Sequence, residues 1–350
     1  MGRSRFGLKT LTLTDSRMAT ITDNGNHQNC TFVDKQLKRY FLPVAYSLIF
    51  IVGLVGNVTS IGVYLTKLRP WKSSSIIMVN LALTDLLYVL SMPFLVYYYS
   101  WESWTLGEFM CRLVRFGFHF NLYGSILFLT CHAVFRFVVV TRPLKAAQVQ
   151  QPCWGIVACS FVWIITAAEI APMLNIIKVD ELDNKTYCMD FASAIGKSSE
   201  LHWYSWLLTT LGFLLPLVVV FICYIGIVMK LAEGPGASTS SRMRARRVTV
   251  LILVVFVVCF LPYHILRVLR IESQHKTLCI YEKVIHAAYI ISRPLAGLNT
   301  CFNLALYTLS GDKFKGAFLS TFHWTGWQTK ARSLLHKAFI SRAGTDTAAV

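Results

Sequence analysis

Seven long apolar segments constrain this chain more than any other feature of its sequence. They occupy residues 40–66, 74–99, 110–140, 155–177, 201–231, 248–271 and 284–309. A helix of about 20 apolar residues, rising about 1.5 Å per residue, crosses the hydrocarbon core of a bilayer, so each segment is long enough to span it. The chain is 55% hydrophobic and 15% charged, whereas a soluble domain has about 25% charged residues. These features predict an all-α membrane protein with a bundle of seven transmembrane helices.

The positive charge of the chain is concentrated between the apolar segments. The formal net charge is +17, and basic residues fill the links after the first, third and fifth segments. Such a charge suits either nucleic acid or the cytoplasmic loops of a membrane protein, and this distribution favours the second. The link after the fourth segment is acidic and contains Asp180, Glu181 and Asp190. We therefore expect a multi-pass plasma-membrane protein with an extracellular N-terminus, in contact with the lipid bilayer and not with nucleic acid.

The same pattern divides the chain into three regions. Residues 1–39 are expected to form an extracellular N-terminal segment, residues 40–309 the transmembrane domain, and residues 310–350 a cytoplasmic region. The last region begins with Lys and Phe residues at 313–318, which predict a short amphipathic helix on the inner membrane surface.

Three triplets match the sequon for N-glycosylation. Those that begin at Asn29 and Asn184 fall in the predicted outer regions, and we expect both to be glycosylated. The third triplet begins at Asn57 inside the first apolar segment, where no glycosylation enzyme reaches. A sequon alone is weak support, because such triplets are common by chance.

Basic residues also lie at membrane depth, where charge is costly. Arg115, His119 and Tyr123 are spaced four residues apart, so they share one face of the third helix. Arg267 and Arg293 occupy the outer halves of the sixth and seventh segments. None of these three segments contains an acidic residue. The expected complement of these cations is an anion that enters from outside.

Two alternatives stay open for these arginines, and also for Arg270, which lies one turn above Arg267. Each guanidinium can extend along its apolar stem to the aqueous boundary. One of them can also pair with an acid inside the protein. The acids available are Glu169 in the fourth segment and Glu181 and Asp190 in the link after it. Tyr289 and His119 are candidates for neutral hydrogen bonds to a ligand, although aromatic residues on helices more often serve packing.

A series of motifs in chain order resembles the rhodopsin-like (class A) family of G-protein-coupled receptors. The matching residues are Gly56-Asn57, Asn80-Leu81-Ala82-Leu83-Thr84-Asp85, Cys111, Arg136, Trp163, Pro216, Tyr224, Cys259-Phe260-Leu261-Pro262 and Asn303-Leu304-Ala305-Leu306-Tyr307. Each match is weak alone, but together, in order and at the family's spacing, they are close to decisive. The resemblance implies a receptor that binds a ligand from outside and activates a heterotrimeric G protein.

Four cysteines lie in the predicted outer regions, where disulfides form. Four cysteines allow three connectivities, and spacing alone does not choose among them. The resemblance implies Cys111 with Cys188 and Cys30 with Cys279.

Within the family, the chain is similar to the purinergic-like branch and especially to the dicarboxylate receptors, first those for 2-oxoglutarate and then those for succinate. The stretches that carry this similarity are Arg69-Pro70-Trp71-Lys72-Ser73-Ser74, Phe118-His119-Phe120-Asn121-Leu122-Tyr123, Pro262-Tyr263-His264-Ile265-Leu266-Arg267, Arg270-Ile271-Glu272-Ser273 and Ser292-Arg293-Pro294-Leu295-Ala296. The similarity implies a small dicarboxylate ligand. The expected ligand-binding residues are Arg115, His119, Tyr123, Arg267, Arg270, Tyr289 and Arg293.

The resemblance also implies two further sites within the bundle. The family's sodium and water pocket corresponds to Asn57, Asp85, Ser125, Asn299 and Asn303. A sodium ion beside Asp85 is the only cofactor expected, and a water network without sodium is the alternative. The residues that match the family's activation machinery at the inner face are Arg136, Tyr224 and Tyr307.

The chain departs from the family pattern in three places. Phe135 precedes Arg136 where an acid is usual, Phe260 replaces a tryptophan, and Leu304 replaces a proline. These changes are compatible with the fold. They leave the ligand-free activity open, because Arg136 lacks the acidic neighbour that restrains the equivalent arginine in the family.

Other functions are less well supported by the sequence. A nucleotide or an acidic lipid is the alternative ligand within the class. An anion transporter or channel would need a continuous polar pathway, and apart from the residues around Asp85 the middles of the segments are largely apolar. No nucleophile–base set or metal-binding motif is present in the sequence, so an enzyme is not expected.

Overall fold

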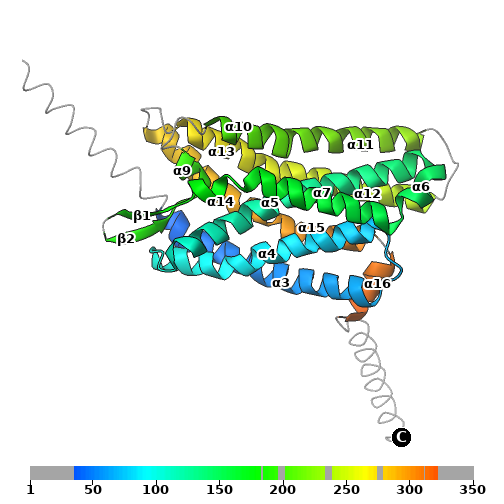
Figure 1. Cartoon of the computed structure of the whole chain (residues 1–350), viewed down its shortest axis with the longest axis horizontal. Helices are drawn as coiled ribbons and strands as arrows, with labels where there is room; N and C mark the ends of the chain where they lie inside the picture. The colour runs from blue at the N-terminus through cyan, green and yellow to red at the C-terminus, as the bar shows by residue number, and fades with distance from the viewer. Residues whose placement is uncertain are drawn as a thin grey trace, which may run out of the picture.

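The computed structural model describes residues 35–182, 184–195, 202–232, 239–273, 279–310 and 312–321. Long helices lie side by side in one bundle (Figure 1). The first four membrane segments correspond to α3 (Leu42–Thr66) after the π-helical turn η1 (Leu37–Phe41), α4 (Ser73–Trp101), α5 (Gly107–Thr141), and α7 (Pro152–Ile170) followed by α8 (Met173–Ile176). The fourth helix was predicted to be continuous, but Pro172 divides it because proline has no backbone N–H to donate.

The last three segments are each built from more than one helical piece. The fifth contains α10 (His202–Thr209), η3 (Thr210–Leu214) and α11 (Leu215–Ala232), the sixth α12 (Thr239–Val255), η4 (Phe256–Phe260) and α13 (Leu261–Ser273), and the seventh α14 (Cys279–Gly297) and α15 (Asn299–Ser310). Among the described residues, six helical stretches are long and apolar enough to cross a membrane. The seventh segment is interrupted at Leu298, between α14 and α15.

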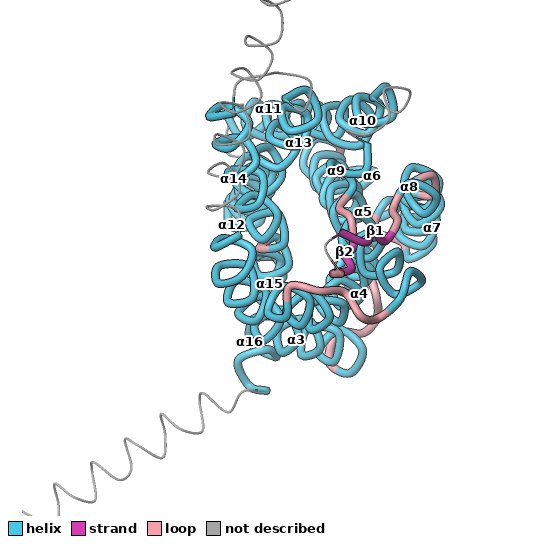
Figure 2. The backbone as a smooth tube through the Cα atoms, turned by 90° about the vertical axis from the view of Figure 1, so that its left-hand side faces the viewer, coloured by secondary structure: helices cyan, strands magenta, loops and turns pink. Residues whose placement is uncertain are grey.

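Short elements mark the two ends of the bundle. At one end, β1 (Val179–Leu182) pairs antiparallel with β2 (Lys185–Cys188), and α9 (Phe191–Ile195) follows. We call this the hairpin end. At the other end lie α6 (Pro143–Val149) and α16 (Asp312–Thr321), and we call this the α16 end. Figure 2 looks along the bundle from the hairpin end and shows the long helices end-on.

The outer surface of the bundle is apolar. On α7, the side chains of Phe161 and Ile164 are 63% and 68% exposed, and on α11 those of Phe221 and Ile222 are 53% and 59% exposed. Apolar side chains exposed along whole helices suit contact with lipid tails rather than water. The all-α membrane bundle expected from the sequence is therefore confirmed.

A disulfide joins the hairpin to the bundle. Cys111 on α5 is bonded to Cys188 at the end of β2, with their Cα atoms 5.6 Å apart, so this predicted pair is present in the structure. The predicted pair of Cys30 and Cys279 lies outside the described side chains, as does the sequon at Asn29. Asn184 is exposed at the turn of the hairpin, with a left-handed φ of 57°.

Two helix backbones come close together where α7 crosses the start of α4. A Cβ atom added at Gly155 would lie 2.7 Å from the Cα and 2.9 Å from the carbonyl oxygen of Ser73. Ser73 is held in place, because its hydroxyl donates to the carbonyl oxygens of Val149 (2.8 Å) and Gln151.

We expect Gly155→Ala to lower the melting temperature of the purified protein. The added methyl would meet backbone atoms that cannot rotate away, and overpacking of this kind costs about 1–3 kcal/mol. Gly62→Ala is the matched control, since nothing lies within 4 Å of a Cβ added there. Alanine stabilises a helix by about 1 kcal/mol relative to glycine, so the control should melt at the same or a higher temperature. Equal melting temperatures for both variants would contradict the expected clash.

Candidate ligand-binding site

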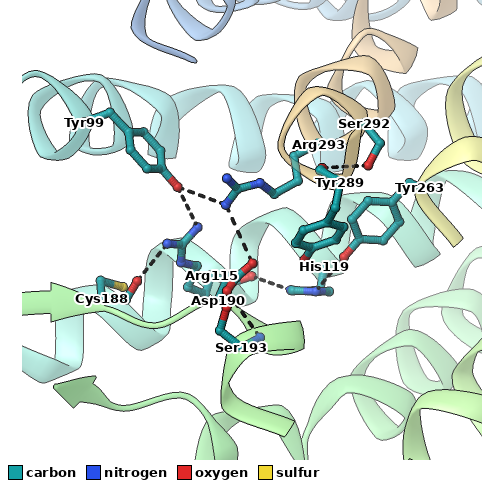
Figure 3. A network of polar contacts seen from close by, with 10 residues as sticks. All are labelled: Tyr99, Arg115, His119, Cys188, Asp190, Ser193, Tyr263, Tyr289, Ser292 and Arg293. Atoms are coloured by element: carbon teal, nitrogen blue, oxygen red, sulfur yellow. Dashed lines mark hydrogen bonds and ion pairs between the residues drawn. The ribbon is translucent and has the colours of Figure 1, made fainter. Parts of the chain in front are cut away.

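Two buried arginines meet inside the hairpin end of the bundle (Figure 3). Arg115 on α5 and Arg293 on α14 are 6% and 5% exposed. Each donates a hydrogen bond to the hydroxyl of Tyr99 on α4, over 3.4 Å and 3.0 Å respectively. Arg115 also donates to the carbonyl oxygen of Cys188 over 2.8 Å. The disulfide-linked end of the hairpin thus helps to fix the guanidinium of Arg115.

An acidic residue of the loop lies beside these arginines. Asp190 follows β2 by two residues, and its Oδ2 atom is 3.8 Å from Nη1 of Arg293. Its Oδ1 atom accepts a hydrogen bond from the backbone N–H of Ser193 over 3.3 Å. Burial alone would raise the pKa of the Asp190 carboxyl, but Arg293 and Arg115 lower it below its ordinary value. Of the alternatives that the sequence left open, the pairing of one arginine with Asp190 is therefore found for Arg293, and Asp190 is ionised at neutral pH.

Arg267 on α13 lies in a separate set of hydrogen bonds and is fully buried. It donates to the hydroxyl of Tyr123, to Oγ1 of Thr209 over 2.8 Å and to the carbonyl oxygen of Ser205 over 3.3 Å. All of these acceptors are neutral, and the described residues provide no carboxylate within ion-pair distance of Arg267. The predicted set of three arginines is thus divided into a pair and a single cation.

Aromatic rings lie between the arginine pair and Arg267. The guanidinium of Arg293 lies 5.6 Å from the ring centre of Tyr289, and that of Arg267 lies 5.8 Å from the ring centre of Tyr263. The two tyrosine rings are 5.9 Å apart, centre to centre. Cation–π contacts of this length stabilise a buried guanidinium. The rings connect the two basic groups into one site lined by α5, α13 and α14.

His119 belongs to this site but has partners within the protein for both of its ring nitrogens. Nδ1 is 2.9 Å from the carbonyl oxygen of Arg115, and Nε2 is 3.2 Å from the hydroxyl of Tyr263. A neutral ring satisfies both contacts when Nδ1–H donates to the carbonyl and Nε2 accepts from the tyrosine. His119 therefore adds no charge to the site in this arrangement.

Arg270 has a carboxylate partner close to its own position. Its Nη1 atom is 2.8 Å from Oε1 of Glu282, which lies in the first turn of α14. The seventh segment predicted from the sequence begins at residue 284, after Glu282. The prediction therefore included no acid beside Arg270. Arg270 therefore has an ion pair of its own, and its role in ligand binding stays a prediction.

Arg115, Arg267 and Arg293 also keep unused donors, as Arg270 does at its own Nε–H. The Nε–H groups of Arg115, Arg267 and Arg293 are buried and have no hydrogen-bond partner among the described residues. Buried polar groups are almost always paired, and an exception points to a missing water, ion or ligand. Three orphaned guanidinium donors in one site point to an acceptor with several oxygen atoms.

A second polar cluster surrounds Asp85 in the middle of the bundle. One carboxylate oxygen accepts from Asn121 over 2.9 Å, and the other accepts from Asn303 over 2.9 Å and from Tyr307 over 3.4 Å. Asn121 also donates to Ser125 over 3.3 Å. Asn57 accepts from Tyr307 over 3.4 Å. Four of the predicted residues therefore lie in one hydrogen-bonded network, with Asn121 as an additional member.

Asn299, the fifth predicted member, is buried on α15, four residues before Asn303. Neither side-chain atom of its amide has a hydrogen-bond partner within the described chain, and Oδ1 of Asn303 is likewise unpaired. Oxygen atoms of this kind are the ligands that hard cations prefer. The residues present are thus compatible with a bound cation as well as with ordered water.

Arg136 lies near the α16 end and contacts the end of the seventh segment. Its Nε–H donates to Nε2 of His132 over 3.3 Å, and Nη2 donates to the carbonyl oxygen of Ser310 over 3.1 Å. Ser310 is the last residue of α15, where carbonyl groups lack helical partners and carry the negative end of the helix dipole. Arg136 is therefore restrained although no acid precedes it. Of the other two residues predicted at this face, Tyr224 is half-buried on α11 and Tyr307 is bonded into the Asp85 network.

Glycines make room for Leu304, one of the three family departures, and for Phe137. Leu304 packs against Gly56, where an added Cβ would lie 2.3 Å from Leu304 Cδ1. Phe137, which follows Arg136, packs in the same way against Gly226, with a Cβ distance of 2.3 Å. In both pairs a glycine on one helix provides room for a large side chain on another.

The sequence did not indicate three residues that the structure brings to these sites. Tyr99 joins the two arginines, Thr209 contacts Arg267, and Asn121 contacts Asp85. Asn121 carried a usable signal, because it is four residues before Ser125 and so shares its helical face. Tyr99 and Thr209 carried none, since tyrosines and threonines are frequent in all of these helices.

Comparison with known proteins defines the class to which this bundle and site belong. The sequence profile of the family described as "7 transmembrane receptor (rhodopsin family)" matches residues 56–307. The chain therefore belongs to the rhodopsin family of seven-transmembrane receptors, as its motifs predicted.

Particular relatives narrow this class. "2-oxoglutarate receptor 1" of Rattus norvegicus is 49% identical over 295 residues, which cover 84% of this chain and 87% of that protein. The Mus musculus protein of the same name is 48% identical over 294 residues, covering 83% and 87%. A purinoceptor of Gallus gallus is 36% identical over 291 residues, covering 82% and 80%. The predicted similarity to the purinergic-like branch and to 2-oxoglutarate receptors is confirmed.

Proposed function

We propose that this protein is a plasma-membrane receptor for a small dicarboxylate such as 2-oxoglutarate and that it activates a heterotrimeric G protein. The relatives named for 2-oxoglutarate support this ligand class, since they match across most of the chain. The hairpin end would face the extracellular medium and the α16 end the cytoplasm. The ligand then enters the site from the hairpin end.

One observation supports the ligand class above all others. Arg115 and Arg293 are both buried, both point at Tyr99, and both keep an Nε–H without an acceptor. The planar guanidinium binds a carboxylate through two parallel N–H donors, which suits these unused groups. Arg267 offers a third such donor beyond the tyrosine rings. We assign one carboxylate of the ligand to Arg115 and Arg293 and the other to Arg267.

The test is a panel of anions applied to cells that express the full chain, with G-protein activation as the readout. We expect 2-oxoglutarate and related dicarboxylates to activate, with affinities on the order of micromolar to millimolar, because desolvation of a dianion offsets much of its binding energy. Monocarboxylates and nucleotides should be at least about tenfold weaker. Activation by a nucleotide and by no dicarboxylate would overturn the dicarboxylate assignment in favour of a nucleotide ligand. The nucleotide is included in the panel because the chain is 36% identical to a purinoceptor.

The proposed orientation has its own test at Asn184. An enzyme in the secretory pathway can reach this exposed side chain only if the hairpin faces the outside. We expect Asn184→Gln to remove one glycan, seen as a smaller mass shift when a glycosidase is added. Thr59→Ala destroys the buried sequon at Asn57 and should leave the glycan mass unchanged. An identical shift for Asn184→Gln and the unchanged chain would contradict the orientation or the use of this sequon.

We also propose a role for the cluster at Asp85 and for the residues at the α16 end. The Asp85 carboxylate and the unpaired oxygens of Asn299 and Asn303 support a sodium ion at mid-depth. Arg136, Tyr224 and Tyr307 are proposed to rearrange when the G protein binds. Activation is then a shift in population, because the dicarboxylate must bind the active arrangement better than the resting one.

A further inference from the structure

Asp190 is the acidic member of an otherwise basic site. Its side chain is 15% exposed, and the preceding disulfide at Cys188 fixes the backbone of the loop that carries it. Within the described residues, it is the only carboxylate within ion-pair distance of Arg115, Arg267 or Arg293. Figure 3 shows its carboxylate directed at the guanidinium of Arg293. A negative charge in this position opposes the binding of any anion, so its presence requires a reason.

The buried charges of the site give that reason. Arg115, Arg267 and Arg293 contribute three positive charges, and Asp190 contributes one negative charge, which leaves a formal charge of +2. Asp190 stays ionised, because the neighbouring guanidinium groups lower its pKa in spite of its burial. His119 is neutral in the hydrogen-bonding arrangement described above. Lys38 on η1, which is half-buried, also lowers the pKa of Asp190 and lies outside the four groups counted here.

A buried site of charge +2 is matched by a ligand of charge −2. A trianion would leave one negative charge unbalanced and would bring it near the Asp190 carboxylate, where like charges repel strongly at low dielectric. Repulsion of the wrong ligand is a general route to specificity. From this balance we propose that Asp190 is a specificity-determining residue that restricts the site to dianions and rejects anions of higher charge. The inference rests on the proposed function and adds the rule by which the site selects among carboxylates.

A different role for Asp190 predicts a different result. If its carboxylate merely occupied the arginines until a ligand displaced it, neutralising it would raise the potency of every anion by the same factor. If it only supported the loop through its bond to Ser193, neutralising it would lower surface expression or all potencies together. Only the charge rule predicts that the order of ligands changes with their charge.

The experiment compares citrate with its monomethyl ester, which has nearly the same size and one charge fewer. 2-Oxoglutarate serves as the reference dianion. Concentration–response curves of G-protein activation are measured for the unchanged receptor, Asp190→Asn and Asp190→Glu at matched surface expression. Glu181→Gln is the control for loss of an acid from the same hairpin, because Glu181 is exposed on β1.

We expect Asp190→Asn to raise the potency of citrate relative to both dianions by at least about tenfold. Asp190→Glu keeps the charge and should retain the original order of ligands, as should Glu181→Gln. The inference is overturned if Asp190→Asn, present at the surface, leaves the ratio of citrate to dianion potency within about twofold, including the case in which all potencies rise together. A receptor that responds to 2-oxoglutarate with an unchanged ratio defeats only this inference. An unchanged receptor that responds to no dicarboxylate defeats the proposed function and the inference with it.

Discussion

Alanine in place of Arg293 is expected to lower the potency of the activating dicarboxylate by roughly 30-fold. The variant loses a buried donor to a ligand carboxylate, and hydrogen bonds between charged groups contribute about 1.5–3 kcal/mol each, so a loss of about 2 kcal/mol follows. It also leaves Asp190 without its partner at 3.8 Å, and the unpaired carboxylate then repels the incoming anion more strongly. Concentration–response curves at matched surface expression measure the shift.

Three comparisons make this prediction specific. Arg293→Lys should restore only part of the potency, because an ammonium is a point charge and cannot present two parallel donors. A ligand methylated on the carboxylate that Arg293 binds should lose little more in the variant, since the two losses share one contact and do not add. Arg270→Ala removes an arginine already paired with Glu282 and should respond almost normally. Normal responses from Arg115→Ala, Arg267→Ala and Arg293→Ala alike would mean that no arginine clamp exists.

Arg136→Ala is expected to abolish G-protein activation while ligand binding persists. The side chain lies near the α16 end, and the described contacts of its guanidinium are to His132 and the Ser310 carbonyl rather than to the site at the hairpin end. Removing it takes away the cation that the proposed rearrangement presents to the G protein. Binding of a labelled dicarboxylate and G-protein activation, measured on the same cells, separate the two effects.

The control for this variant is Arg244→Ala on α12, a half-buried arginine at the same end of the bundle. It should retain most of the signal. That result would show that loss of a positive charge at this end does not by itself uncouple the receptor. Full signalling by Arg136→Ala at equal surface expression would rule out its assigned role. Loss of ligand binding together with the signal would indicate a damaged fold instead.

Hydrophobic length and charge distribution were sufficient to predict the bundle, because both follow from the composition of single segments. The breaks within the segments were not predicted. Pro172 divides the fourth helix although proline is tolerated in many transmembrane helices. The interruption at Leu298 follows Pro294 and Gly297, which both weaken a helix, but α4 continues unbroken through Pro93, so such residues alone do not fix where a helix ends. Such breaks are decided by packing against other helices, which one segment does not encode.

Only those residues of the candidate site that are unusual at membrane depth could be predicted from the sequence. An arginine at membrane depth is conspicuous, so Arg115, Arg267 and Arg293 were found. Their grouping into a pair and a single cation depends on Tyr99 and Tyr123, and tyrosines are common in these helices. The position of Asp190 depends on how the hairpin folds back over the bundle, and several acids in that link were equally plausible partners. Sequence periodicity does not determine where a loop lies relative to the helices.

The hydrogen bond from Arg136 to the carbonyl oxygen of Ser310 limits how substitutions and changes in pH can affect the resting receptor. Its acceptor is a main-chain oxygen, so it neither titrates nor depends on which side chain occupies position 310. In a resting receptor restrained by a carboxylate, a single substitution or a drop in pH can remove the acceptor. Here neither change removes the acceptor, and the contact is lost when the end of α15 or the Arg136 side chain moves. Substitutions that break this contact are then expected at Arg136 or in the packing of α15, and acidification alone should leave its carbonyl acceptor intact.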